Sequence, residues 1–135
     1  MELVTPPYWE EACKHLSKRD RVMRKLIADH GSACLRSRGD AFTTLARSIV
    51  GQQISVKAAQ SVWERLRAVM GAEAGVDRGP LSPAHMLTRS PEELRQAGLS
   101  ARKVEYMLDL ARHFHEERVH VAQWQQMDDE AIIEE

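Results

Sequence analysis

The sequence contains few of the residues that characterise β-sheet, disulfide-stabilised or membrane-spanning proteins. Aromatic residues make up 5% of it and β-branched runs are scarce, which argues against a β-sandwich or barrel. Its two cysteines, Cys13 and Cys34, are too few for a disulfide framework or a four-thiolate metal site. No apolar run approaches the roughly 18 residues that would span a bilayer, and the N-terminus lacks a signal-peptide pattern. These absences predict a cytoplasmic protein that does not bind membranes.

The chain does contain enough apolar residues for one core, and its charge is unevenly distributed. It has 135 residues, 43% hydrophobic and 29% charged, with a formal net charge of −1. Residues 1–70 contain 12 Lys plus Arg and 7 Asp plus Glu, a net charge of +5. Residues 71–135 contain 7 Lys plus Arg and 13 Asp plus Glu, a net charge of −6. The first half is therefore suited to a polyanionic partner, although mixed charges can also simply solvate helix surfaces.

Apolar residues recur at three- and four-residue spacing along almost the whole chain, which is typical of amphipathic helices. Polar capping residues, prolines and glycines mark where these helices begin and end. The expected helices cover residues 8–16, 20–31, 40–50, 55–71, 90–98 and 100–117, with two more starting at residues 82 and 128. Residues 72–81 contain two glycines and a proline and are expected to form a flexible loop. The sequence thus predicts an all-α fold, a bundle of seven to eight short helices.

Simple motifs for metal binding or catalysis are missing. Of six histidines, His113 and His115 are closest in sequence, but on a helix they point about 200° apart. No serine lies in a nucleophile elbow, and no glycine-rich loop has phosphate-binding spacing. We therefore expect no metal and no cofactor, and motif logic alone identifies no catalytic residue.

The polar segment Gly51–Ala59 joins two strongly apolar predicted helices and is the best candidate for a binding site. Two neighbouring glutamines, Gln52 and Gln53, are not needed for a core, and a long uncharged amide can fill a gap while forming hydrogen bonds. Lys57 and the free N–H groups of the helix that begins at Ser55 could hold a phosphate. The alternative is an ordinary helix–helix turn with Ser55 as its cap.

Two segments of the chain resemble the alkylation-type DNA-3-methyladenine glycosylases of the helix-hairpin-helix superfamily. They are residues 42–59 (FTTLARSIVGQQISVKAA) and residues 94–111 (LRQAGLSARKVEYMLDLA). The start of the chain, Pro7 to Trp9 followed by helices, is also similar to small bacterial members. The resemblance implies base-excision repair, in which a damaged purine is flipped out of double-stranded DNA and its N-glycosidic bond is hydrolysed. It also implies a bacterial cytoplasmic protein acting on the nucleoid.

The resemblance assigns roles to residues of the Gly51–Ala59 segment. Gln53 occupies the position of the side chain that plugs the space left by the flipped base, with Gln52 and Ile54 beside it. Ser55 and Lys57, beside them, are the candidates for phosphate contacts from the residue pattern described above.

The aromatic pair Tyr8 and Trp9 has two possible roles. These side chains could line a pocket for the flipped base by stacking, or they could pack together at the start of the first helix. Trp63 lies on an apolar helix stripe and is expected to be structural.

The family's glycine-rich hairpin and its catalytic aspartate have no counterpart in the 135 residues. Asp128, Asp129 and Glu130 match the helix before the hairpin, so no catalytic residue is assigned. We expect residues 1–135 to form a single incomplete glycosylase domain that is inactive alone, with N-terminal helices in residues 1–36 and a helical subdomain in residues 37–135. Exposed apolar faces on the N-terminal helices are expected, with self-association as one consequence.

Two alternative functions remain open. One is a glycosylase for oxidised or mismatched bases, which belongs to the same superfamily. The other is a non-catalytic all-α interaction module in which Ile132 and Ile133 dock on a partner.

Overall fold

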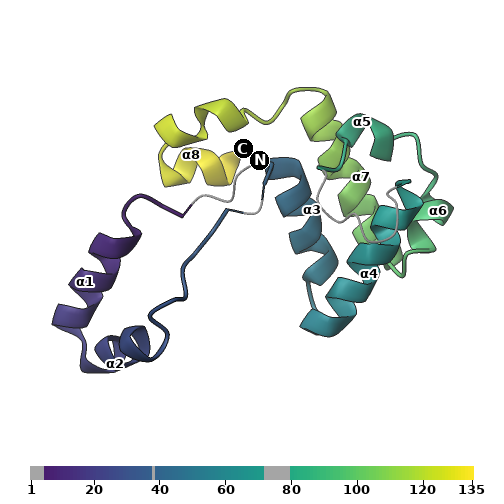
Figure 1. The fold of residues 1–135 in the computed structure, drawn as a ribbon. Coiled ribbons are helices and arrows are strands. Elements are labelled where there is room, and N and C mark those ends of the chain that lie inside the picture. The colour runs from purple at the N-terminus through teal and green to yellow at the C-terminus, as the bar shows by residue number, and fades with distance from the viewer. Residues whose placement is uncertain (1–4, 38, 72–79) are drawn as a thin grey trace. The chain divides into compact units, whose positions relative to one another are not determined.

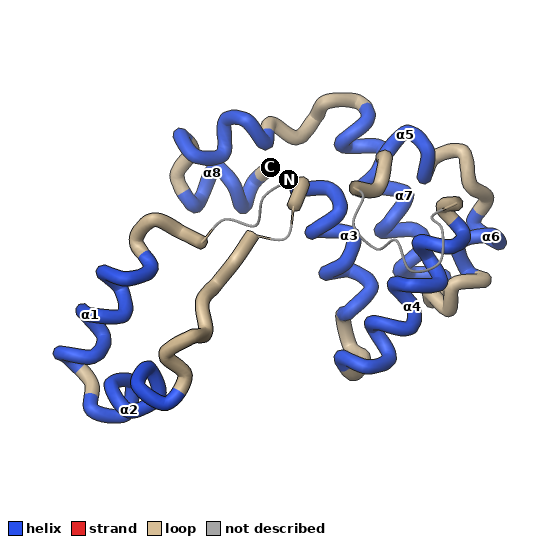
Figure 2. The backbone as a smooth tube through the Cα atoms, viewed as in Figure 1, coloured by secondary structure: helices blue, strands red, loops and turns tan. Residues whose placement is uncertain are grey.

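The computed structural model describes residues 5–37, 39–71 and 80–135. All regular secondary structure in these described residues is helical, as Figures 1 and 2 show. The helices fall into two compact units, residues 1–39 and residues 40–135. The predicted all-α fold is confirmed. Within the described part of the chain, no helix is both long and apolar enough to cross a bilayer.

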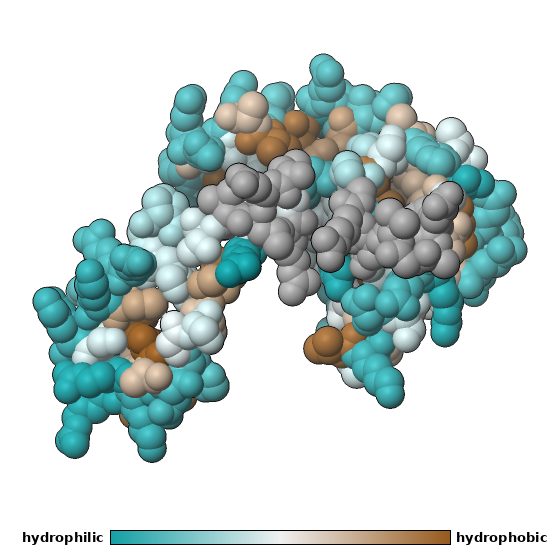
Figure 3. Space-filling model, in the orientation of Figure 1, coloured by the Kyte–Doolittle hydropathy of each residue, from teal (hydrophilic) through white to brown (hydrophobic). Residues whose placement is uncertain are grey.

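The first unit is a pair of short helices, α1 (Trp9–Arg19) and α2 (Arg21–Asp29), that pack against each other. Asp20 joins them, because it follows the last residue of α1 and its Oδ1 accepts the Met23 N–H of α2 at 2.8 Å. Neither helix contains a buried residue, and Val22 is 68% exposed. Apolar surface is visible among the hydrophilic side chains of this unit in Figure 3. The expected exposed apolar side chains are present, whereas self-association stays a prediction.

The second unit holds the remaining helices of the described residues. They are α3 (Ala41–Gly51), α4 (Val56–Val69), α5 (Pro83–Met86), α6 (Pro91–Arg95), α7 (Ala101–His115), the 3-10 helix η1 (Val121–Gln126) and α8 (Asp129–Glu134). Each α-helix of this unit begins after a polar residue whose side chain accepts a backbone N–H of the first turn: Asp40, Ser55, Ser82, Ser90, Ser100 and Asp128. Ser90 and Glu93 form the predicted capping box. Local capping therefore fixes where these helices start.

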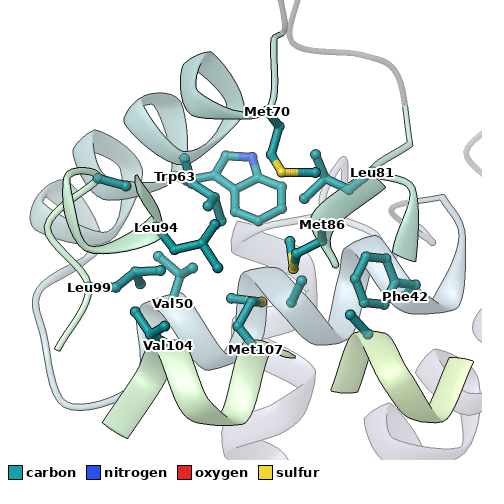
Figure 4. Close-up of a cluster of buried hydrophobic side chains, with 14 residues drawn as sticks. Phe42, Val50, Trp63, Met70, Leu81, Met86, Leu94, Leu99, Val104 and Met107 are labelled. Atoms are coloured by element: carbon teal, nitrogen blue, oxygen red, sulfur yellow. The ribbon is translucent and has the colours of Figure 1, made fainter. Parts of the chain in front are cut away.

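The core of the second unit lies among α3 to α7: α7 packs against α3, α5 and α6, and α4 packs against α3 and α6. Figure 4 shows Trp63, Met86, Leu94 and Met107 converging on its centre. Trp63 is 2% exposed, which confirms its structural role. The buried members are Phe42, Ala46, Val50, Trp63, Leu66, Met70, Leu81, Met86, Leu94, Ala97, Leu99, Val104, Met107 and Ala111. This core anchors the helices that carry the candidate site.

Two features of the second unit differ from the sequence prediction or lie beyond it. The 3-10 helix η1 was not predicted, because no side-chain cap marks its start at His120. Residues 72–79 of the predicted loop lie outside the described residues. Leu81, assigned to the same loop, is buried, and its N–H donates to the Thr43 hydroxyl at 2.9 Å.

Candidate nucleic-acid interface

Helices α3 and α4 are joined by a tight corner formed by residues 52–55 (Figure 1). Gln52 has an extended backbone with ψ of 135°, and Gln53 has a φ of +63°. A non-glycine residue in this left-handed region costs roughly 1–2 kcal/mol, because its Cβ crowds the following carbonyl oxygen. Ser55 then starts α4 by accepting the Ala58 N–H at 3.1 Å. The corner therefore depends on a strained backbone conformation at Gln53.

Polar and aromatic contacts hold α3 and α4 together behind the corner. The Arg47 Nη2 donates to the Gln60 Oε1 at 2.7 Å, and the Arg47 guanidinium lies 5.5 Å from the centre of the Trp63 ring. A Cβ added to Gly51 would come 3.8 Å from the Ala59 Cβ, an ordinary van der Waals contact. The two helices thus form a braced support for the residues that connect them.

The predicted site residues of this segment are brought together on one exposed surface. Gln52, Gln53, Ile54, Ser55 and Lys57 are all exposed. Apolar surface lies among them as well, since Ile54 is 40% exposed, and Figure 3 shows brown surface at this end of the unit. Their roles toward DNA stay predictions.

The start of α4 also presents unpaired backbone donors next to these side chains. Among the hydrogen bonds of the described residues, the first in this helix come from the N–H groups of Ala58 and Ala59 to Ser55. The N–H groups of Val56 and Lys57 precede them in the first turn, where a helix offers no intrahelical acceptor, and both residues are exposed. Exposed N–H groups, the positive end of the helix dipole and the Lys57 amine are features that bind an anion.

Lys103 of α7 reaches this corner from a distant part of the sequence. Its Nζ donates to the carbonyl oxygens of Val50 at 2.9 Å and of Gln52 at 2.7 Å. Sequence reasoning missed this contact, because no local pattern links residues 53 positions apart. The sequence indicated only that both segments, residues 42–59 and 94–111, resemble the same family; it did not indicate that they touch.

A groove of about 460 Å³ lies on the same unit beside α3 and α7. Ile49 and Tyr106 line it. Ile49 is next to Val50 in the sequence, and Tyr106 lies one helical turn after Lys103. The other lining residues are Leu45, Asp109, Leu110, His113, Phe114, Val119, Trp124, Ile132 and Glu135. Sequence reasoning did not identify this groove, which depends on η1 and α8 packing near α7.

One end of this groove carries a cluster around Glu135. Its carboxylate accepts hydrogen bonds from the Trp124 indole N–H and from the His120 ring and backbone N–H. These hydrogen bonds lower the pKa of the Glu135 carboxyl, and the bond from Trp124 has the largest effect. The cluster ties α8 back to η1.

Of the aromatic pair that could line a base pocket or pack at the start of the first helix, one member lines a groove. Trp9 lines a groove of about 650 Å³ within the first unit, together with Cys13, Leu26 and Cys34. Tyr8 does not line this groove and is 62% exposed. A stacking role for either side chain stays a prediction.

The two cysteines of this groove are free thiols. The Arg36 Nε donates to the Cys34 Sγ at 3.3 Å, and the Thr5 hydroxyl donates to it at 3.8 Å. These bonds lower the pKa of the Cys34 thiol. Among the described residues, no cluster of three or more His, Cys, Asp or Glu side chains could hold a metal ion. The absence of a metal or cofactor from the protein's chemistry stays a prediction.

Comparison with known proteins identifies the family. Residues 46–134 match the HhH-GPD superfamily of base excision DNA repair proteins, over more than half of the chain. The chain belongs to this superfamily. The HhH-GPD match begins inside α3 and extends through α8, so it includes the corner, Lys103 and all residues of the groove beside α7 except Leu45 and Glu135. The predicted helix-hairpin-helix superfamily is confirmed.

A solved structure extends the similarity of this HhH-GPD chain to its first unit. The crystal structure of a DNA-3-methyladenine glycosidase from Bacillus halodurans matches 99% of this chain, with 25% sequence identity and a TM-score of 0.70. This chain spans 58% of the length of that protein. No curated protein sequence matches the chain.

Proposed function

We propose that this HhH-GPD protein is a DNA glycosylase that enters damaged duplex DNA with the corner between α3 and α4. The observation that carries the proposal is the exposed Gln53 at the tip of that corner, held with a φ of +63° inside the segment that matches the family. A strained, exposed side chain on a braced support is suited to pushing into a base stack.

Gln53 is proposed to fill the space that a flipped base leaves. Extruding a base costs a few kcal/mol of stacking and pairing. A glutamine is long enough to occupy part of the gap, and its amide can form hydrogen bonds with the base that has lost its partner. Gln52 and Ile54, exposed on either side of it, are proposed to contact the neighbouring bases.

The start of α4 is proposed to hold the DNA backbone beside the wedge. The exposed N–H groups of Val56 and Lys57, the Ser55 hydroxyl and the Lys57 amine offer donors and positive charge within one helical turn. Such contacts position a protein on DNA but do not read its sequence.

The proposed substrates are alkylated purines such as 3-methyladenine. This choice is supported by the 25% identity to a DNA-3-methyladenine glycosidase. An alkylated purine is electron-poor and leaves readily, so the enzyme needs a pocket and one carboxylate that stabilises the oxocarbenium-like transition state or the attacking water. We assign that carboxylate to no residue of 1–135, and we expect residues 1–135 alone to release no base.

The test uses the protein translated from its complete reading frame. Duplex DNA treated with a methylating agent should release 3-methyladenine at rates well above background. Duplexes that contain 8-oxoguanine or a single mismatch serve as matched substrates. Release from these instead of alkylated DNA would move the specificity to the other branch of the superfamily, and no release from any of them would contradict the glycosylase proposal.

A further inference from the structure

The end of α3 needs a partner for its last carbonyl groups. The final carbonyls of any helix have no intrahelical N–H to accept from, and a glycine in the left-handed conformation often solves this by redirecting the chain. Here the C-cap residue Gln52 is extended, and the residue in the left-handed conformation is Gln53. The carbonyls of Val50 and Gln52 both accept hydrogen bonds from the Lys103 Nζ. A cation at this position also complements the negative end of the helix dipole.

The Gln52 carbonyl belongs to the peptide group that joins Gln52 to Gln53. A peptide group is planar, so a hydrogen bond to its oxygen fixes the orientation of the whole plane. That plane sets both the ψ of Gln52 and the φ of Gln53. The 2.7 Å bond from Lys103 therefore acts directly on the torsion that puts Gln53 in its left-handed conformation.

Lys103 is itself fixed to the core of the second unit. Its backbone N–H is held by the Ser100 hydroxyl at 3.2 Å, in the first turn of α7. The next residue, Val104, is 3% exposed, and Met107, one turn further on, is fully buried. Its side chain thus connects a rigid helix to an exposed corner.

We infer that Lys103 is a positioning residue for the DNA wedge: its amine holds the Gln52–Gln53 peptide so that the Gln53 side chain enters the base stack in a fixed direction. The inference rests on the proposed function. It also separates two lysines at one corner. The amine of Lys103 is occupied by protein carbonyls, whereas the exposed Lys57 is free to contact a phosphate.

The first part of the experiment needs no DNA. Lys103→Met removes the donors and the charge but keeps the stem, and Lys103→Arg keeps the charge. Arg102→Met is the matched control, because it removes one positive charge from the exposed neighbouring position on the same helix. Hydrogen exchange of the Gln52 backbone amide, which donates to the Ile49 carbonyl at 3.3 Å, should be about tenfold faster in Lys103→Met, with exchange around Trp63 unchanged. Arg102→Met should leave both regions unchanged.

The second part measures binding by the full-reading-frame protein to two duplexes, one undamaged and one with an abasic-site analogue. Lys103→Met should weaken binding to the abasic duplex by about tenfold, since a charged hydrogen bond is lost. Binding to the undamaged duplex and the dependence of affinity on salt should stay close to wild type. Lys57→Met should instead weaken binding to both duplexes and lower the salt slope by about one. Lys103→Arg should restore part of the loss.

A double-mutant cycle with Gln53→Ala decides whether Lys103 acts through the wedge. If it does, Lys103→Met has little further effect in the Gln53→Ala background. An equal loss in both backgrounds, an equal loss on both duplexes, or a drop in salt slope would overturn the inference and leave the glycosylase proposal intact. A wild-type protein with no preference for the abasic duplex would contradict the proposed function itself, and the inference with it.

Discussion

The two units of this chain have similar amphipathic helices but very different interiors. In the first unit, α1 and α2 bury no residue at all, whereas α3, α4 and α7 of the second unit bury several residues each. The difference lies in the number of neighbours, because a pair of short helices cannot enclose a side chain that five packed helices can. Since most helical stability in proteins comes from tertiary packing, the second unit should fold firmly and the first should open easily.

The largest expected difference is in hydrogen exchange. Amides of α1 and α2 should exchange at least about 100-fold faster than those of α4 and α7, because local opening free energies range from near zero to the global value. The measurement is exchange followed by mass spectrometry on peptides from each unit. Equal protection of the two units would mean that the first unit is covered by contacts beyond its own two helices.

Matched leucine substitutions should separate the units by stability. Leu66→Ala in the core should destabilise the fold by about 2–5 kcal/mol, because Leu66 is fully buried. Leu26→Ala should change the stability by less than about 0.5 kcal/mol, because Leu26 is 46% exposed. Urea denaturation followed by circular dichroism measures both. Leu66→Met, which preserves the volume, is a control expected to lose less than about 1.5 kcal/mol.

Removal of a helix cap should have a smaller effect. In the second unit it should lower the global stability, whereas in the first unit it should lower only the local helicity. Ser90→Ala breaks the capping box of α6 and should cost about 1 kcal/mol of global stability. Asp20→Ala removes a comparable cap from α2 and should lower helicity without shifting the main unfolding transition. If both variants shifted the midpoint of the main unfolding transition by a similar amount, the two units would unfold together.

The smallest effect concerns pH at the end of the second unit. Hydrogen bonds from Trp124 and His120 lower the pKa of Glu135, so the charged carboxylate favours the folded arrangement. The stabilisation is fully present above the ordinary glutamate pKa near 4.3 and is lost as the pH falls through the lower pKa of the folded state. Fluorescence of Trp124, isolated by difference from Trp124→Phe, should change in that acid range. Glu135→Gln should remove the transition, and a transition that persists there would assign it to another group.

Much of the fold could be predicted from the sequence, because its signals are local. A capping residue and the N–H that it binds are separated by three residues, so Asp40, Ser55, Ser90 and Ser100 mark helix starts correctly. The candidate corner could be found for the same reason, since its residues are contiguous. Its support could not, because the contact between Lys103 and Gln52 joins positions 51 apart in sequence. Likewise, no local cap marks η1, and the groove beside α7 depends on it.

The left-handed backbone of Gln53 has a consequence for how this protein would evolve under artificial selection. Glycine adopts such a conformation without steric cost and asparagine at a reduced one. In a library randomised at position 53 and selected only for resistance to heat, glycine and asparagine should therefore replace glutamine. The proposed wedge role of Gln53 predicts that selection for DNA repair in living cells restores a long side chain. The difference in unfolding free energy between the two selected proteins would then measure the stability cost of the proposed wedge.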